Sequence, residues 1–339
     1  MKLIVNPRQP VLSRPSTPWW VIALALLLLL FMISIISTAL GAVRLSIRDI
    51  LHVWLGGELE QTQQIIMEMR MPRVLIAVLV GGALAMSGAI FQAITRNNLA
   101  SPDIIGVSNG AGLMAVILIV LFPAAPPGVL PIFAFIGGAT AALAIYLLTW
   151  RNGIEPNKLI MMGIAISALC LAAREAVVLK APDDLETALF WLVGSVWGQG
   201  SERLISILPW FLSLFTLALV ITRPLAVLQL GDKVARGLGS KVELIRLLAS
   251  VIGVGLAGCA IAVAGNIGFV GLLGPHIARL LVGPDVRRVL PVAALIGAIV
   301  TVSADTLGRI VLAPAELPAG LLTALIGAPY FLWLLYRER

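Results

Sequence analysis

The sequence has little charge and few of the side chains that build metal sites. Only 12% of its 339 residues are charged, and it holds two histidines and two cysteines. Cys170 and Cys259 lie far apart inside apolar segments, and His52 and His276 are equally isolated. Because protein metal sites gather about three or four such ligands, we predict no metal bound by this chain. Both cysteines are interpreted as small buried apolar residues.

The sequence also lacks the features of an enzyme. It contains no G-x-x-x-x-G-K-[ST] loop that would cradle the phosphates of ATP. Serine and threonine residues are scattered along the apolar segments without a partnered base, which fits hydrogen bonding between helices better than nucleophilic catalysis. We therefore expect neither ATP hydrolysis by this chain nor the chemistry of an intramembrane enzyme.

Long apolar stretches fill most of the chain. Hydrophobic residues make up 60% of it, and the mean hydropathy is +1.03. Stretches near the length of about 20 residues that crosses a bilayer begin near 19, 74, 107, 129, 159, 204, 245, 267, 289 and 319. They predict an all-α polytopic membrane protein of about ten transmembrane helices. One membrane domain spans 19–336, between tails at 1–18 and 337–339. The first stretch is too long for a signal peptide, although residues 38–42 faintly resemble a cleavage site.

The basic residues indicate the orientation. With ten spans and the N-terminus inside, eight of the 24 lysines and arginines fall outside and 16 inside. The eight are Arg44, Arg48, Arg70, Arg73, Arg174, Lys180, Arg203 and Arg309. Because cytoplasmic loops are enriched in lysine and arginine, both termini are predicted to be cytoplasmic.

Polar and glycine-rich residues interrupt two apolar segments. They occur in Leu99–Gly110 and in Gly268–His276, where we expect a Gly-Pro break. Irregular backbone survives at membrane depth only where protein or a water-filled cavity covers it, so these segments indicate a translocation path. Glycine pairs such as Gly81-Gly82 and Gly137-Gly138 predict close helix contacts.

Charged residues are scarce inside the predicted spans. Arg174 with Glu175, and Asp305 with Arg309 four residues later, have the spacing of structural ion pairs. We find no midplane site of the kind that proton- or sodium-coupled carriers use. We therefore expect the energy for transport to come from another subunit.

Two arginines lie where the topology rule disfavours them. Arg70 and Arg73 are three residues apart at the outer end of the second predicted span, a spacing that places both on one face of a helix. Guanidinium groups are suited to gripping carboxylates, sometimes with two parallel hydrogen bonds. We interpret the pair as a docking site for an acidic partner.

The cytoplasmic connection at 223–246 mixes apolar and charged residues at near-helical spacing. Leu228, Leu230, Val234 and Leu238 are predicted to share one face, beside Asp232, Lys233 and Arg236. One interpretation is an amphipathic helix on the lipid surface. A helix that fits a groove on a cytosolic partner is favoured.

Six motifs in order resemble the FecCD-type permeases of iron-siderophore and cobalamin ABC importers. They are Arg70–Leu75, Gly88–Gln92, Asn97–Pro102, Leu230–Gly239, Gly268–His276 and Glu316–Pro329. The resemblance covers nearly the whole chain. It implies the type II ABC importer permease fold in the bacterial inner (plasma) membrane.

The resemblance also implies partners and site residues. These permeases pair around a central path, with two cytosolic ATPase subunits that hold ATP and magnesium and with a periplasmic substrate-binding protein. Its acidic residues would dock on Arg70, Arg73 and Arg309. ATPase coupling would involve Gly231, Asp232, Ala235, Arg236, Gly237, Leu238 and Gly239. The cytoplasmic gate would involve Asn97, Asn98, Leu99, Pro156 and Asn157, where Asn98 replaces the family's usual proline.

The cargo expected from the resemblance is a ferric siderophore. Likeness to enterobactin-type permeases at Trp150–Ile154 and Ser87–Gln92 favours a catecholate cargo and a heterodimer. Cobalamin and haem are the alternatives within the class. An ion-coupled secondary carrier is the alternative from another class.

Overall fold

The computed structural model describes residues 17–41, 46–55, 57, 64–103, 106–150, 156–179, 191–312 and 315–337. All regular structure in these ranges is helical. The seven longest apolar helices are α1 (Trp19–Ala39), α4 (Met71–Thr95), α6 (Leu130–Thr149), α7 (Pro156–Val178), α9 (Ser201–Val220), α12 (Val242–Ala264) and α14 (Val286–Val311). Three shorter apolar helices are α5 (Val107–Leu121), α13 (Val270–Val282) and α15 (Ala319–Arg337). The remaining short elements are α2 (Ile47–Trp54), the π-helical turn η1 (Ile65–Arg70), the 3-10 turn η2 (Pro127–Val129), α10 (Thr222–Gln229) and α11 (Asp232–Gly237).

The predicted all-α membrane fold is confirmed. Seven helices in the described ranges are long and apolar enough to cross a bilayer. The start of each predicted stretch lies within three residues of the start of one of the seven long or three shorter helices. Hydrophobicity located these segments because each one must satisfy its backbone internally in lipid.

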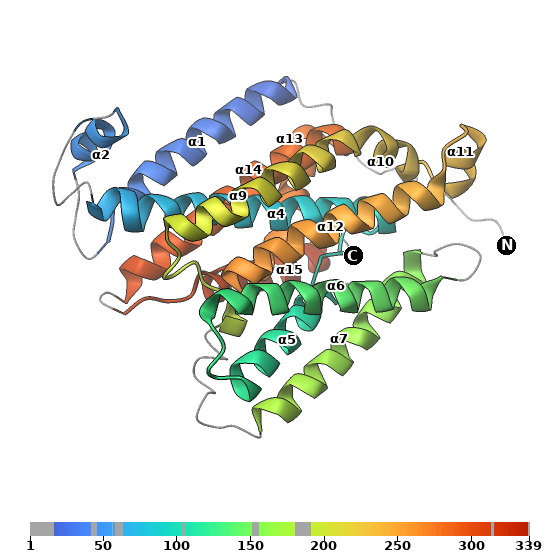
Figure 1. Ribbon diagram of the computed structural model, residues 1–339. Coiled ribbons are helices and arrows are strands. Elements are labelled where there is room, and N and C mark those ends of the chain that lie inside the picture. The colour runs from blue at the N-terminus through green and yellow to red at the C-terminus, as the bar shows by residue number, and fades with distance from the viewer. Residues whose placement is uncertain are drawn as a thin grey trace.

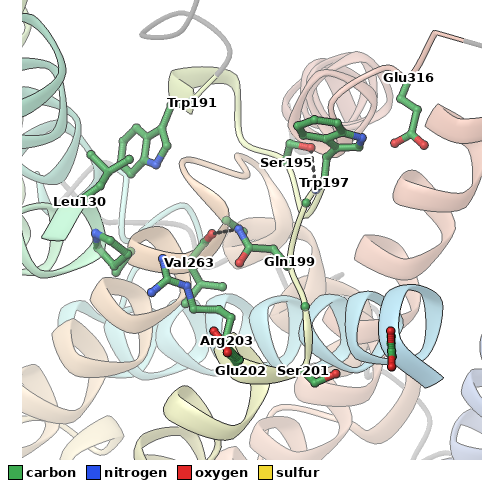
Figure 2. A pocket seen from close by; sticks show the side chains of 16 residues that line it. Leu130, Trp191, Ser195, Trp197, Gln199, Ser201, Glu202, Arg203, Val263 and Glu316 are labelled. Atoms are coloured by element: carbon green, nitrogen blue, oxygen red, sulfur yellow. Dashed lines mark hydrogen bonds between the residues drawn. The ribbon is translucent and has the colours of Figure 1, made fainter. Parts of the chain in front are cut away.

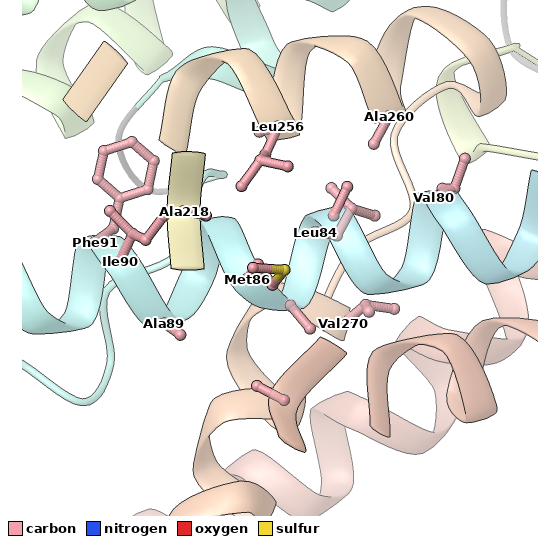
Figure 3. Close-up of a cluster of buried hydrophobic side chains, with 14 of the residues drawn as sticks. Val80, Leu84, Met86, Ala89, Ile90, Phe91, Ala218, Leu256, Ala260 and Val270 are labelled. Carbon is pink, nitrogen blue, oxygen red and sulfur yellow. The ribbon is translucent and has the colours of Figure 1, made fainter. Parts of the chain in front are cut away.

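Helix α4 forms the centre of the bundle. Figure 1 shows it in the middle of the bundle, crossed by α9, α12 and α14. In Figure 3, Leu84, Met86 and Ile90 of α4 lie among Leu256 of α12, Ala218 of α9 and Val270 of α13. Nearly every α4 side chain from Val80 to Thr95 is buried. By contrast, α1, α7 and α9 leave most of their side chains outside the core.

Glycines let the central helices approach one another closely, as predicted for Gly81 and Gly137. A methyl group added at Gly81 would collide with the Gly297 carbonyl of α14. One added at Gly137 of α6 would collide with the Gly110 carbonyl of α5. Small residues of this kind hold helices together in lipid, where burying apolar surface gives no advantage.

Two irregular connections interrupt the bundle. Residues 96–103 and 106 lie outside helices between α4 and α5, and residues 265–269 separate α12 from α13. The predicted Gly-Pro break is wrong, since α13 runs from Val270 through Pro275 without interruption. The break lies before the helix, where Phe269 has a φ of 65°. A membrane helix tolerates a proline because neighbouring groups satisfy the backbone that it frees.

The two ends of the bundle differ. Figure 1 shows α2 at one end and the short helices α10 and α11 at the other. Helix η1 leads into α4 at the α2 end, and α14 ends there close to the last turn of α1. We call the α2 end the outer end and the α10–α11 end the inner end.

Candidate functional site

At the outer end, Arg73 of α4 binds two carboxylates. Its Nε atom donates to both oxygens of Asp305 at 3.1 Å, and its Nη2 atom donates to Asp305 Oδ1 at 2.7 Å. The same Nη2 atom lies 2.8 Å from Glu316 Oε2, just before α15. The Asp305 side chain is 3% exposed and that of Glu316 is 30% exposed. Arg73 therefore binds one buried carboxylate, that of Asp305, and one partly exposed carboxylate, that of Glu316.

The other two predicted docking arginines cap the end of α1. Arg309 donates to the carbonyls of Ser37 and Leu40 at 2.9 and 3.2 Å, and to the Ser37 hydroxyl at 2.6 Å. Arg70 donates to the Thr38 carbonyl at 3.0 Å. The last carbonyls of a helix have no partner within it and carry partial negative charge, so both cations are well placed. The sequence of α1 has no basic residue in its own last turn.

Arg73 and Arg309 thus meet at Asp305, and Arg70 lies close to Arg309 at the end of α1. Arg309 Nε lies 3.3 Å from Asp305 Oδ2, which confirms the predicted pair four residues apart. The predicted pair of Arg174 and Glu175 is also formed, at 2.8 Å. The side chains of Arg73 and Arg309 are 11% and 5% exposed. Their docking role stays a prediction, and their internal contacts hold α1, α4 and α14 together.

A cavity of about 1430 Å³ opens beside this cluster. It is lined by Glu68, Leu130, Pro131, Glu316, residues 262–264 of α12, and Trp191, Ser195 and residues 197–203. Figure 2 shows Gln199 reaching Val263, with Arg203 and Glu202 below and Glu316 on the far side. Gln199 Nε2 donates to the Val263 carbonyl at 3.0 Å, and the Ser195 N–H donates to the Ala264 carbonyl at 2.7 Å. Aromatic, amide and charged groups therefore face one space.

At the inner end, α10 and α11 present an apolar surface. Leu230, Val234 and Leu238 are 59%, 51% and 64% exposed. The prediction that Leu228 shares this face is wrong, because Leu228 is buried against the core. The chain turns sharply between the two helices at Gly231, whose φ of 99° favours glycine. We call Leu230, Val234 and Leu238 the inner apolar face.

Asp232 lies behind this face and joins three segments. Arg246 Nη2 of α12 donates to its two carboxylate oxygens at 3.0 and 3.1 Å. Arg96, which follows α4, donates to Asp232 Oδ1 at 3.2 Å. Arg236 instead pairs with Glu243 at 3.2 Å. Asp232, which the resemblance assigns to ATPase coupling, therefore uses its carboxylate for contacts inside the chain.

The predicted gate residues follow Arg96 directly. The Leu99 N–H donates to the Asn97 side-chain oxygen at 2.9 Å, and the Ala100 N–H donates to the Asn97 carbonyl at 3.2 Å. Asn98 is exposed at the tip of this turn. The other two predicted gate residues lie at the start of α7, which begins at Pro156, and the side chains of Pro156 and Asn157 lie outside the described part of the chain. The gate contact between the two loops stays a prediction.

Four features of these sites were missed from the sequence. Arg96, Arg246, the ion pair of Glu316 and the cavity segment at 191–203 were not singled out as functional. Arg246 carried a usable signal, because it is a charged residue one turn inside an apolar helix, where an internal partner is required. Its partner Asp232 could not be chosen, since pairing across 14 residues depends on how α11 folds back.

Comparison with known proteins identifies the family of the chain. Residues 26–337 match the model of the FecCD transport family. The chain is 44% identical over 315 residues to the Fe(3+)-citrate import system permease protein YfmE of Bacillus subtilis, covering 93% of this chain and 94% of that protein. It is 41% identical to the hemin transport system permease protein HmuU of Yersinia pestis, covering 93% and 95%. A solved inward-facing ABC transporter of the metal-chelate type superposes with a TM-score of 0.84 at 32% identity, covering 93% of this chain and 99% of that one. The chain therefore belongs to the FecCD transport family.

Proposed function

We propose that the chain is the permease subunit of an ABC importer that moves a ferric siderophore from the periplasm to the cytoplasm. The observation that carries this proposal is the family match over residues 26–337 of an all-helical membrane chain. In the proposed topology, the seven long and three shorter helices make ten spans. Both termini and the inner end with α10 and α11 then lie in the cytoplasm, and the outer end faces the periplasm of the bacterial inner membrane.

Energy is proposed to come from two cytosolic ATPase subunits that bind ATP and magnesium. The acidic residues in the described ranges lie in connections or within two turns of a helix end. This distribution supports an external energy source, because ion-coupled carriers place such groups near the midplane. The permease itself has no catalytic role in this scheme.

The inner apolar face is the proposed contact with the ATPase. Val234 is exposed on α11, and Leu230 and Leu238 are exposed directly after α10 and α11, with a tight glycine turn between the two helices. An apolar helix face of this kind fits a groove on a protein partner. Residues 231–239 would form the contact, and the ion pairs of Asp232 with Arg246 and Arg96 would hold this segment against the bundle.

The outer arginine cluster is the proposed contact with a periplasmic substrate-binding protein. Arg73 and Arg309 contact the carboxylates of Asp305 and Glu316, and Arg70 lies close to Arg309. Guanidinium groups of this kind would bind the carboxylates of an acidic partner. Glu316 is the exposed member and lines the cavity as well. A partner carboxylate that reaches Arg73 would take the place of Glu316, beside the cavity that receives the cargo.

A second permease subunit is proposed to cover the exposed faces of α7 and α15. Met161 and Leu169 of α7 are 71% and 65% exposed, and Leu325 and Leu332 of α15 are 68% and 66% exposed. Two-subunit assembly around a path follows from family membership. A heterodimer is favoured over a homodimer.

The cargo is proposed to be a ferric chelate. The 44% identity to a ferric citrate permease makes a hydroxycarboxylate chelate the first to test, followed by the catecholate expected from the sequence. Haem is the second candidate, supported by 41% identity to a hemin permease. The test is growth of a strain that lacks this chain on ferric citrate, a ferric catecholate or hemin as its iron source. Loss of growth on one source, restored by the intact gene, identifies the cargo, and unchanged growth on all three contradicts the proposal.

A further inference from the structure

We propose that Arg96 and Asp232 form the mechanical link between the ATPase-contacting helix α11 and the loop at 97–99, with the buried Arg246 as its fixed point. This inference rests on the proposed function, because it concerns how ATPase movement reaches the gate. None of the three residues needs to touch ATP or cargo. They are positioning residues.

Asp232 is the first residue of α11 and belongs to both halves of the link. Its Oδ1 atom accepts from Arg246 Nη2 at 3.0 Å and from Arg96 Nη2 at 3.2 Å. Val234 lies on the same short helix, Leu238 directly follows it, and both side chains are exposed. A partner that rotates α11 would therefore turn the Asp232 carboxylate about its contact with Arg246 and shift its contact with Arg96.

Arg246 is anchored, so it can serve as the fixed point. Its side chain has no exposed surface, and it lies one turn into α12, which packs along α4. Its Nη1 atom also lies 3.7 Å from Glu243 Oε2. A buried guanidinium is stable only while its carboxylate stays close, which ties Asp232 to the membrane bundle.

Arg96 is the movable end. Its side chain is 39% exposed, and it adopts a left-handed conformation with a φ of 52° where α4 ends. The next residue, Asn97, begins the turn that holds Leu99 and Ala100. A side chain on Gly231 would meet Arg96 Nη1 at 3.2 Å, so the turn of the coupling segment lies against the same guanidinium.

The two ion pairs of Asp232 therefore differ in kind. The contact with Arg246 is buried and joins α11 to a long helix. The contact with Arg96 is partly exposed and joins α11 to a turn. Partly exposed pairs add little to stability, so Arg96 is better explained by positioning the 97–99 turn than by holding the fold. Asp232 belongs to the predicted coupling segment, and Arg96 directly precedes the predicted gate residues. The two residues of this ion pair are 136 residues apart in the sequence.

The test uses the full importer, with its ATPase subunits, second permease subunit and binding protein, in lipid nanodiscs. A single reporter cysteine, N98C, is placed in a C170A/C259A background, and its labelling by a polar maleimide is measured with and without ATP and magnesium. R96Q is the test variant. R287Q is the matched control, because Arg287 is also a cytoplasmic-end arginine in a partly exposed carboxylate pair, at 3.1 Å from Asp285, but it lies at neither the coupling segment nor the gate turn.

We expect ATP to change N98C labelling in the parent and in R287Q, and R96Q to reduce that change by about fivefold or more, as for a lost coupling between sites. ATP hydrolysis and the melting temperature should stay near parental values in R96Q, while uptake of radiolabelled ferric citrate per ATP falls. D232N should also lose the ATP-dependent labelling change, but with a lowered melting temperature, because it removes the carboxylate that pairs with the buried Arg246. The labelling change in R96Q/D232N should be no smaller than in D232N alone. An ATP-dependent labelling change that persists in R96Q overturns the link. The proposed link is also overturned if ATP does not change N98C labelling in the parent, because the 97–99 turn then does not move in response to the ATPase. Failure of the chain to assemble with any ATPase would instead contradict the proposed function.

Discussion

Arg73 and Asp305 are 232 residues apart in the sequence, yet their Nη2 and Oδ1 atoms lie 2.7 Å apart in the outer half of the bundle. The contact joins α4 to α14, and Asp305 extends it to Arg309, which holds the end of α1. One carboxylate thus fixes three helices. The arginines expected to receive a partner are first of all parts of this internal network.

Removing the central carboxylate should strongly destabilise the protein. D305A leaves Arg73 and Arg309 buried without their shared counter-charge, which should cost about 3 to 5 kcal/mol of unfolding free energy. Thermal and denaturant unfolding in detergent measures the loss. E175A is the control, because Glu175 is 59% exposed and its pair should contribute less than about 1 kcal/mol. Equal stability of the two variants would contradict the structural role of Asp305.

Glu316 should compete with the binding protein for Arg73. E316Q keeps the size of the side chain but removes its charge, so docking should tighten by about threefold to tenfold if the lost contact is worth about 1 kcal/mol. R73Q should weaken docking. Titration of the binding protein onto nanodisc-bound importer at low and high salt measures both, and high salt should reduce both effects. Unchanged affinity in E316Q would show that Glu316 does not occupy the docking position.

Charging the inner apolar face should prevent assembly with the ATPase. V234E and L238E place a carboxylate on an apolar surface that the partner must desolvate. Co-purification of the ATPase with the permease should be lost in both variants. L55E is the control, because Leu55 is 87% exposed at the outer end. Retention of the ATPase by both inner variants would move the contact elsewhere.

Asp103 should make stability fall as pH rises. Burial raises the pKa of Asp103, although the Ser108 hydroxyl donates to its carboxylate and opposes the rise. A folded pKa above the unfolded value of about 3.9 favours the folded state at low pH, and this contribution is lost as pH rises through the folded pKa. D103N keeps an oxygen acceptor for Ser108 without titrating. Its melting temperature should therefore depend less on pH than that of the parent as the pH rises above about 4. Parallel pH curves would contradict this expectation.

Asp285 should behave with the opposite sign. Burial alone would raise its pKa, but hydrogen bonds from the Arg287 side chain and N–H, with the charges of Arg287 and Arg288, lower the pKa. Asp285 caps the start of α14, and D285A should cost about 1 kcal/mol at neutral pH, whereas D285N should cost less. The stabilisation present above pH of about 3.9 is lost as pH falls through the folded pKa, so the difference between D285A and the parent should shrink in acid. If the stability difference between D285A and the parent did not depend on pH, the charge of Asp285 would make no contribution, and only its hydrogen bond as the helix cap would stabilise the fold.

The helices could be predicted from the sequence because each apolar segment carries its own signal. Contacts between distant segments could not. The spacing of Asp305 and Arg309 indicated their pair, but nothing local indicated that Arg73 would join it from α4. Leu228 was assigned to the wrong face because a single helical period was assumed across Gly231, where the chain turns. The break was predicted at Pro275, but α13 continues through this proline, and the irregular backbone lies at 265–269.

The most direct test of the account is uptake of radiolabelled ferric citrate by proteoliposomes that contain this chain with its second permease subunit, ATPase subunits and binding protein. The account predicts uptake that requires ATP, the ATPase and the binding protein together, and that persists when proton and sodium gradients are abolished. Uptake by the permease alone under a proton or sodium gradient, without ATPase, would contradict it and identify an ion-coupled carrier.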